Sequence, residues 1–469
     1  MDTVFWTVAD VLRATGGEMA GGPDALRFAS VSIDSRTIGE NDLFVAVKGE
    51  THDGHAFLED VVAKGCRGIV LAREKKEAAA GFPETVVRVL VPDTIRALGD
   101  LAAFHRGRFS IPVTAITGSN GKTTTKEMTA SVMARKFKTL KTEGNLNNHF
   151  GLPLTLFRLD GSHGAAVVEL GMNHPGEILR LSAICRPDVG VITNINAAHL
   201  EGLGSVEAVM RAKGELIENI KPDGVIVLNA DDAYCLCLAE ASPRKVFRFG
   251  FSKDAEARGI AVVSKSDGTD FTLVLPSGTI PVALKSPGAF MVRNALAAAA
   301  VGYLNGLSLA SIKAGLEIFV PVKGRMDIRK TPRGVSVIDG SYNANPGSME
   351  AAVRTLAELK GHGRAILVAG DMLELGPESE HLHEALGRLA AVLGIDAIFH
   401  TGRFAAAVKK GAHAAGMAAA AVVAGDKPEV TAALMDFIRP GDWVLVKGSR
   451  GAGMEEIVAG LMTMDGPAA

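Results

Sequence analysis

The sequence has only four cysteines, and none has the spacing of a zinc site or of a Cys-x-x-Cys redox pair. They are Cys66, Cys185, Cys235 and Cys237. One interpretation is that Cys235 and Cys237 chelate a metal ion from a single short segment. The other is that all four are reduced core thiols, which predicts a cytoplasmic location.

An excess of charge of one sign is also missing. Lysine and arginine number 50, aspartate and glutamate 52, and the formal net charge is -2. A protein whose main partner is nucleic acid needs a basic surface for the phosphate backbone, so no nucleic-acid partner is expected.

Long apolar runs and a basic leader are absent too. No stretch of about 18 apolar residues lacks a polar break, so no membrane span is expected. The first residues, Met1-Asp-Thr-Val-Phe-Trp, carry an acid and no basic residue, which is not the pattern of a secretory signal. We find no internal repeat, and 469 residues are enough for two to four domains.

The pattern of apolar runs predicts an α/β fold with three domains, covering residues 1–108, 109–318 and 319–469. In the first we expect strands at 28–33, 42–47 and 68–71 and a helix at 55–64. In the second, short buried strands typical of a parallel sheet are expected at 113–116, 165–169, 189–192 and 225–228. After these strands we expect a polar interval with a strand at 271–275. Two helices, at 294–304 and 311–319, are expected next. In the third domain, strands at 335–339, 365–369, 397–400 and 443–447 predict a Rossmann-like, doubly wound sheet.

The segment Thr117-Gly-Ser-Asn-Gly-Lys-Thr-Thr joins a predicted strand to a predicted helix. Backbone N–H groups in such a glycine-rich turn hold phosphate oxygens, the lysine reaches the terminal phosphates, and a threonine hydroxyl binds Mg²⁺. The usual spacing places a glycine at position 116, where this chain has isoleucine; Gly118 makes this a shorter loop variant. The segment predicts an ATP-binding P-loop in a parallel-sheet domain.

Polar residues follow several predicted strands, where open α/β sheets bind ligands. Glu169 is a natural ligand for Mg²⁺, whereas His199 is either a ligand or a structural residue, because histidine is an unusual partner for magnesium. Lys213 has the pattern of a solvated helix lysine. Asn147 and Asn148 are either sugar or phosphate contacts or ordinary turn residues.

These segments, taken in order, resemble the Mur ligase family. The resemblance covers essentially the whole chain. It is carried by the P-loop, Glu169, Asn196-Ala-Ala-His199, Lys213, Asn294, Arg325, Asp339 and Lys447-Gly-Ser-Arg450, and in the first domain by Ser32-Ile-Asp-Ser-Arg36 and Asp53-Gly-His55. Within the family, Gly144-Asn-Leu-Asn-Asn-His-Phe-Gly-Leu-Pro153 and Asp339-Gly-Ser-Tyr-Asn-Ala-Asn-Pro346 resemble the member that adds D-alanyl-D-alanine. The Asp-Asn-Pro-Arg signature of the member that adds the third residue is absent.

The resemblance implies a set of site residues. The residues expected to act in catalysis are Lys122, Lys213, His199 and Arg325. ATP would be held by Gly118, Ser119, Asn120, Gly121, Lys122, Thr123, Thr124, Asn294, Arg325, Asp339 and Tyr342. The substrates would be held by Ser35, Arg36, Asp53, Gly54, His55, Asn145, Asn147, Asn148, Asn343, Asn345, Lys447, Ser449 and Arg450. Two Mg²⁺ ions are implied, with ligands from Thr123, Glu169, His199 and Lys213, the last as a carbamate formed with CO₂.

Two positions depart from the family pattern. Phe290 and Met291 stand where the family usually has His-Asn, ahead of the adenine-binding position Asn294. In the first domain, Asp34 and Arg36 are alternatively a simple surface ion pair.

The activity implied is ATP-dependent ligation of D-alanyl-D-alanine to UDP-N-acetylmuramoyl-tripeptide through an acyl phosphate, with the first domain holding the uridine end. These small molecules are the expected partners of a monomer. The alternatives are a third-residue-adding or folylpolyglutamate synthase-like ligase, a P-loop kinase or motor-type NTPase, and a nucleotide-binding scaffold without turnover. The identity of the third peptide residue, meso-diaminopimelate or lysine, stays open.

Overall fold

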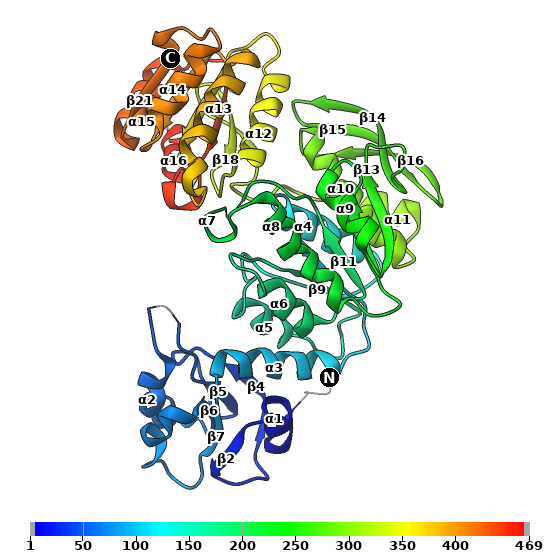
Figure 1. The fold of residues 1–469 in the computed structure, drawn as a ribbon, viewed down its shortest axis with the longest axis vertical. Helices are drawn as coiled ribbons and strands as arrows, with labels where there is room; N and C mark the ends of the chain where they lie inside the picture. Colours follow the sequence, from blue (N-terminus) through cyan, green and yellow to red (C-terminus); the bar gives the residue numbers. More distant parts are fainter. Residues whose placement is uncertain (1–4, 50, 199, 464–469) are drawn as a thin grey trace. The chain divides into compact units, whose positions relative to one another are not determined.

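The computed structural model describes residues 5–49, 51–198 and 200–463. The chain forms two compact units. One comprises Met1–Ile116, Phe137–Gly190 and Glu215–Val225; the other comprises Thr117–Lys136, Val191–Gly214 and Ile226–Ala469. Three larger sheets follow one another along the chain, each accompanied by helices from its own part of the sequence (Figure 1), and a two-stranded pair lies within the sequence of the first.

The N-terminal sheet has five strands in the order β2-β7-β6-β5-β4. Its strands are β2 (Glu18–Gly21), β4 (Ser30–Ser32), β5 (Asp42–Val45), β6 (Gly68–Ala72) and β7 (Val87–Val91); β1 (Trp6–Thr7) and β3 (Arg27–Phe28) form a separate antiparallel pair. The helices are α1 (Val8–Thr15), α2 (Leu58–Ala63) and α3 (Thr94–Gly107), with 3₁₀ turns at Gly54–Phe57 and Arg73–Ala79. Strands β6 and β7 are buried along their whole length, as expected for parallel strands covered on both faces.

The central sheet has nine strands in the order β16-β15-β14-β13-β12-β11-β8-β10-β9. They are β8 (Val113–Thr117), β9 (Thr139–Lys141), β10 (Ala165–Glu169), β11 (Val189–Ile192), β12 (Val225–Asn229), β13 (Lys245–Gly250), β14 (Ala257–Lys265), β15 (Gly268–Leu275) and β16 (Gly278–Leu284). The helices are α4 (Lys122–Met133), α5 (Gly151–Leu156), α6 (Glu177–Cys185), α7 (Leu200–Leu203), α8 (Val206–Gly214), α9 (Ala233–Ala241), α10 (Ala289–Leu304) and α11 (Leu309–Glu317), with a 3₁₀ turn at Glu215–Asn219. Strands β9, β10 and β8 pair in parallel, whereas β14, β15 and β16 form an antiparallel meander.

The C-terminal sheet has six strands in the order β17-β18-β22-β19-β20-β21. They are β17 (Asp327–Lys330), β18 (Ser336–Gly340), β19 (Ala365–Gly370), β20 (Ala397–Thr401), β21 (Val422–Gly425) and β22 (Trp443–Lys447). All pair in parallel except β17, which is antiparallel to β18. The helices are α12 (Pro346–Leu359), α13 (Ser379–Val392), α14 (Ala405–Ala414), α15 (Lys427–Phe437) and α16 (Glu455–Met462), with 3₁₀ turns at Gly376–Glu378, Ala419–Ala421 and Arg450–Ala452.

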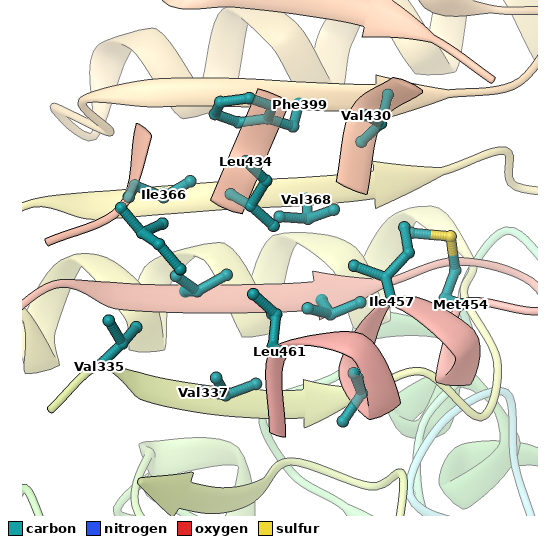
Figure 2. Close-up of a cluster of buried hydrophobic side chains, with 14 of the residues drawn as sticks. Val335, Val337, Ile366, Val368, Phe399, Val430, Leu434, Met454, Ile457 and Leu461 are labelled. Atoms are coloured by element: carbon teal, nitrogen blue, oxygen red, sulfur yellow. The ribbon is translucent and has the colours of Figure 1, made fainter. Parts of the chain in front are cut away.

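A dry cluster of aliphatic side chains fixes the C-terminal sheet against two of its helices (Figure 2). Val335, Val337, Ile366, Val368 and Phe399 come from the sheet side and are fully buried or nearly so. Facing them are residues of α15 and α16 and of the turn before α16, namely Val430, Leu434, Met454, Ile457 and Leu461. The cluster holds the sheet rigid, so that the loops at its strand ends are presented by a fixed scaffold.

The predicted α/β fold with parallel-rich sheets is confirmed. The core strands of the second and third domains lie within about one residue of their predicted bounds. The prediction missed most of the β14–β16 meander, because strands of alternating exposure at a sheet edge lack a continuous apolar run. Across the described part of the chain, no helix has both the length and the apolar composition to cross a bilayer. The four cysteines are free thiols, with Cys235 buried and Cys237 exposed.

Candidate active site

The predicted P-loop lies between β8 and α4. Gly118 and Gly121 have φ angles of 146° and 79°, which L-residues with a Cβ rarely adopt. Each also passes too close to a neighbour for a side chain, Gly118 to the Thr193 hydroxyl and Gly121 to the Asn294 side chain. Lys122 opens α4, and its ammonium donates a hydrogen bond to the Gly118 carbonyl at 2.8 Å, so the cation lies over the loop.

The segment after β11 braces this loop. The Ser119 and Asn120 amides donate to the backbone and side-chain oxygens of Asn194, both at 2.9 Å. The Thr193 hydroxyl donates to the Asn120 carbonyl at 2.6 Å. Sequence reasoning did not select Thr193 or Asn194, although their place directly after a buried strand was a usable signal.

Helix α12 begins beside the same loop. A Cβ added to Gly347 would lie 3.1 Å from the side-chain nitrogen (Nδ2) of Asn120 and 3.2 Å from the Asn196 side chain. The structure therefore brings the start of α12, which follows strand β18, into contact with the P-loop.

Glu169 ends β10 and is almost completely buried. One carboxylate oxygen accepts a hydrogen bond from the Asn147 side chain at 2.8 Å, and the other has no hydrogen-bond partner among the described residues. A buried, unpaired carboxylate oxygen is costly unless something binds it, and a hard cation such as Mg²⁺ is a suitable partner. Thr123, the predicted P-loop ligand, is buried in the first turn of α4, and His199 lies outside the described residues.

Lys213 lies on α8 and is only 1% exposed, so it is not the solvated helix lysine that its sequence context indicates. Burial, and secondly repulsion from the Lys122 ammonium, lowers the pKa of Lys213 well below its usual value. Among the described residues, no carboxylate forms an ion pair with it. A buried, neutral amine is the protonation state that reacts with CO₂, so the surroundings of Lys213 fit the predicted carbamate.

Asn294 is buried on α10, where its side-chain oxygen accepts from the Thr125 hydroxyl of α4 at 3.3 Å. Its nitrogen lies 4.0 Å from the sulfur of Met291, one of the two departures from the family pattern. Asn294 thus links α10 to the P-loop helix, and its contact with adenine remains a prediction, as does any role of Thr124.

At the carboxyl ends of β18 and β22, Asp339 and Lys447 are both buried. The Lys447 ammonium donates to the Asn343 carbonyl at 2.7 Å. Burial, with repulsion from Arg325 and partly offset by attraction to Asp339, lowers the pKa of Lys447 to about 7. Asp339 itself accepts two hydrogen bonds from Ser341, at 3.1 Å from the amide and 2.6 Å from the hydroxyl.

Tyr342 lies between two guanidinium groups. The Arg325 guanidinium is 4.0 Å from the centre of its ring and that of Arg450 is 5.7 Å away. Arg450 is exposed and forms an ion pair with Glu455 at 3.2 Å. Arg325 and Arg450 are therefore both near Tyr342, and their roles in binding nucleotide and substrate remain predictions.

Other predicted substrate residues form hydrogen bonds within their own loops, although Asn145, Asn148 and Asn343 are also exposed to solvent. Asn345 caps α12 by accepting from the Ser348 amide, and Asn343 accepts from the amides of Ala344 and Arg450. Asn148 caps the start of α5, and the Asn145 carbonyl accepts from the Asn147 amide.

In the N-terminal domain, Arg36 forms a bidentate pair with Asp34, at 2.9 and 2.7 Å, which is the alternative raised from the sequence. These hydrogen bonds lower the pKa of Asp34 to about 2, and the Arg36 side chain is 86% exposed. The neighbouring Ser35 carbonyl accepts from Lys64.

The Asp53-Gly-His55 turn of the same domain is held by hydrogen bonds within the turn and to the Ala72 amide. Asp53 accepts from the His55 ring at 2.6 Å, and the other ring nitrogen accepts from the Ala72 amide at 3.0 Å. A Cβ at Gly54 would lie 2.8 Å from the Val47 carbonyl oxygen, so this turn is built for close packing.

Comparison with known proteins shows which family this chain is similar to. Three sequence profiles match in order: "Mur ligase family, catalytic domain" at residues 27–106, "Mur ligase middle domain" at 116–302, and "Mur ligase, glutamate ligase domain" at 324–450. A UDP-N-acetylmuramoyl-tripeptide–D-alanyl-D-alanine ligase of Escherichia coli (strain K12) is 39% identical over 465 residues, covering 97% of this chain and 98% of the relative.

Solved structures agree. A crystal structure of MurF from Acinetobacter baumannii has a TM-score of 0.90 at 35% identity, covering 99% of this chain and 100% of that one. MurF ligase from Thermotoga maritima in complex with ADP has a TM-score of 0.82 at 28% identity, covering 92% and 97%. The chain belongs to the Mur ligase family.

Proposed function

We propose that this chain is an ATP-dependent ligase that joins D-alanyl-D-alanine to UDP-N-acetylmuramoyl-tripeptide in peptidoglycan synthesis. The products are UDP-N-acetylmuramoyl-pentapeptide, ADP and phosphate. The observation that carries the proposal is 39% identity to a ligase of this activity over 97% of the chain. The ADP complex of the Thermotoga maritima relative supports ATP as the nucleotide.

The chemistry requires activation of a carboxylate. An oxygen of the tripeptide carboxylate attacks the γ-phosphorus of ATP, the bond to the bridging oxygen breaks, and ADP leaves. The deprotonated amine of D-alanyl-D-alanine then attacks the acyl carbon, and the tetrahedral adduct expels phosphate as the C–O bond breaks. Most of the catalysis is charge neutralisation and positioning, for which we assign Lys122 and Arg325 on the phosphates.

Two Mg²⁺ ions, when bound, would neutralise phosphate charge, and we assign Thr123, Glu169, His199 and carbamylated Lys213 as their ligands. The unpaired buried oxygen of Glu169 supports this assignment. Carbamylation forms a bond between the neutral Lys213 amine and CO₂ carbon with loss of one proton. It replaces an amine by the anionic oxygen ligand that a hard metal prefers.

We further assign residues 1–108 to the uridine end of the peptide substrate, 109–318 to ATP and 319–469 to completion of the site. The order and bounds of the three matching profiles support this division. We propose that the enzyme acts as a monomer in the cytoplasm, where ATP is available.

The test is an acceptor panel with UDP-N-acetylmuramoyl-tripeptide and ATP. Phosphate release should require both the tripeptide substrate and D-alanyl-D-alanine. Release without an acceptor would indicate an NTPase, and release with UDP-N-acetylmuramoyl-dipeptide and a diamino acid would indicate the third-residue-adding activity. Tripeptides ending in meso-diaminopimelate and in lysine should be compared in the same panel.

A further inference from the structure

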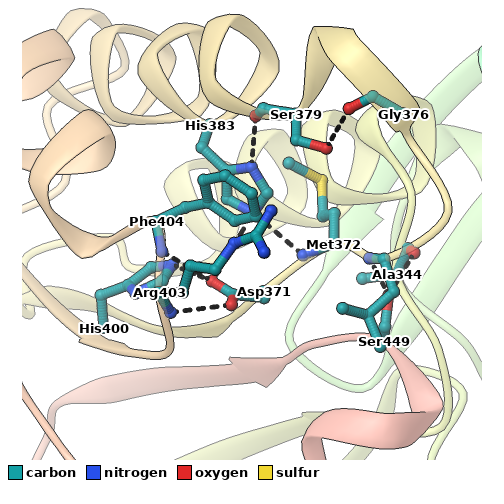
Figure 3. Close-up of polar contacts among 11 residues, drawn as sticks. Ala344, Asp371, Met372, Gly376, Ser379, His383, His400, Arg403, Phe404 and Ser449 are labelled. Carbon is teal, nitrogen blue, oxygen red and sulfur yellow. Dashed lines mark hydrogen bonds and ion pairs between the residues drawn. The ribbon is translucent and has the colours of Figure 1, made fainter.

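The loop that follows β19, from Asp371 to Leu375, lies next to the Lys447–Arg450 segment, because β19 and β22 are neighbours in the sheet. Ser449 joins the two segments. Its amide donates to the Asp371 carbonyl at 3.0 Å, and its hydroxyl accepts from the Leu373 amide at 2.8 Å. The same hydroxyl donates to the Ala344 carbonyl at 3.1 Å, which connects the loop after β18 as well (Figure 3). Ser449 is therefore a junction of three strand-end loops, with its hydroxyl proton and one of its two lone pairs engaged.

His383 of α13 holds the loop from its other side (Figure 3). Its Nε2 accepts from the Met372 amide at 2.9 Å, so the ring proton must be on Nδ1, which donates to the Ser379 carbonyl at 2.6 Å. Burial lowers the pKa of His383, which favours this neutral form.

Asp371, His383 and His400 have potential metal-ligand atoms within 4.8 Å of one another. The lone pair of His383 Nε2 is already used by the Met372 amide, and the Asp371 carboxylate accepts from the amides of Arg403 and Phe404. The cluster is thus a scaffold for the loop and not a metal site.

The scaffold leaves one apolar side chain in solvent. Leu373 is 46% exposed, whereas Met372 and Leu375 are buried. A Cβ on Gly451 would lie 3.0 Å from Leu373 Cδ1, so Leu373 lies against the turn that carries Arg450. The next residue, Glu374, has a φ of 63° and accepts from the Glu201 amide at 3.1 Å, which ties the loop to α7.

An acceptor dipeptide such as D-alanyl-D-alanine offers methyl groups, a carboxylate and an amine. Leu373 lies against the turn that begins with Arg450, so an exposed apolar side chain and an exposed cation come from adjoining strand-end loops. Because the loop is tethered by Ser449, His383 and Glu374, little ordering is needed when a ligand binds.

We propose that Leu373 is a specificity-determining contact for a methyl group of the acceptor dipeptide, with Arg450 pairing with its carboxylate and His383 and Ser449 acting as positioning residues. This rests on the proposed ligase function. The contact would favour alanine over glycine at one position of the acceptor, by roughly tenfold in kcat/KM.

The test compares wild type and Leu373→Ala with D-alanyl-D-alanine, D-alanyl-glycine and glycyl-D-alanine. We expect wild type to prefer D-alanyl-D-alanine, and Leu373→Ala to lose most of that preference against one of the glycine dipeptides, with the KM for ATP unchanged. Val392→Ala, which removes an exposed apolar side chain from the end of α13, is the matched control and should keep the wild-type preference. Unchanged preference in Leu373→Ala against both glycine dipeptides overturns the inference, whereas wild type inactive with D-alanyl-D-alanine overturns the proposed function instead.

The positioning role has its own readout. His383→Leu removes the acceptor for the Met372 amide and should raise the KM for the dipeptide severalfold without changing the KM for ATP. His383→Gln offers an oxygen in place of Nε2 and should recover much of that loss. Equal changes in both KM values in His383→Leu, or no recovery with glutamine, contradicts a positioning role.

Discussion

Two buried lysines in this chain have opposite surroundings. Lys447 has a carbonyl partner at 2.7 Å and lies near Asp339, and its pKa is lowered to about 7. Among the described residues, Lys213 has only the cation of Lys122 as a charged neighbour that affects its pKa, and burial with this repulsion lowers the pKa of Lys213 well below its usual value. Because a buried ammonium without a carboxylate is costly, these surroundings favour the neutral amine of Lys213, whereas Lys447 can exchange a proton near neutral pH.

The difference indicates different uses. The neutral amine of Lys213 is suited to covalent conversion by CO₂ into an oxygen ligand. Lys447 retains its partners and is suited to binding an anionic group of a substrate. The predictions below test this contrast.

The largest effect is expected for Lys213→Ala. Loss of a metal ligand should reduce kcat by roughly a thousandfold. Formate or acetate should restore part of the activity, because a small carboxylate can occupy the vacated position. Arg211→Ala, an exposed residue on the same helix, is the control and should remain active without added carboxylate. Normal activity of Lys213→Ala in carboxylate-free buffer would contradict the assignment.

Lys122→Ala should cost on the order of 3 kcal/mol in the transition state, or about 150-fold in rate, because it removes the cation that neutralises the terminal phosphates. It should also raise the pKa of Lys213, since the repelling charge is gone. Steady-state kinetics measure the first effect, and the pH dependence of CO₂ incorporation measures the second. Near-normal product formation by Lys122→Ala would contradict the assignment of the P-loop as the ATP-binding segment.

Lys447→Met should change how stability depends on pH. The pKa of Lys447 is lower in the folded state, about 7, than its usual 10.5, so the unfolded state binds the extra proton between these values. The contribution of Lys447 to the free energy of unfolding of the wild type therefore rises with pH across that window. Lys447 destabilises the fold most at pH 7 and below. The amount by which Lys447→Met exceeds wild type in free energy of unfolding should be larger at pH 7.5 than at pH 9.5, by about 2 kcal/mol. Urea unfolding at the two pH values gives this difference, and a pH-independent offset would show that Lys447 is not perturbed.

The smallest effect is expected at His400, a buried base whose ring nitrogens have no hydrogen-bond partner in the described part of the chain. Burial, partly offset by Asp371, lowers the pKa of His400 to about 4. The folded state keeps it neutral, so stability is lost as the pH falls from 6.5 towards 4, where only the unfolded state gains a proton. His400→Leu should lose about 1.8 kcal/mol less of its free energy of unfolding than wild type between pH 7 and pH 5. Parallel acid-unfolding curves for the two proteins would contradict this.

The sequence was sufficient for features set by local chemistry. The P-loop follows from glycine positions, and the parallel strands follow from short buried apolar runs. Burial of Lys213 could not be derived, because the pattern of α8 does not say what covers the helix. A role for the loop from Asp371 to Leu375 could not be derived either, since Ser449 and His383, which hold it, are distant in sequence. The conformation of the Asp53–His55 turn likewise depends on a hydrogen bond from the distant Ala72 amide.

The most direct test of the account is ¹³C NMR of the enzyme equilibrated with ¹³C-labelled bicarbonate. We predict a carbamate resonance in wild type and in Lys447→Met that is absent from Lys213→Ala, and a loss of activity when CO₂ is removed. Full activity at depleted CO₂ together with no carbamate resonance in wild type would contradict the assignment of Lys213.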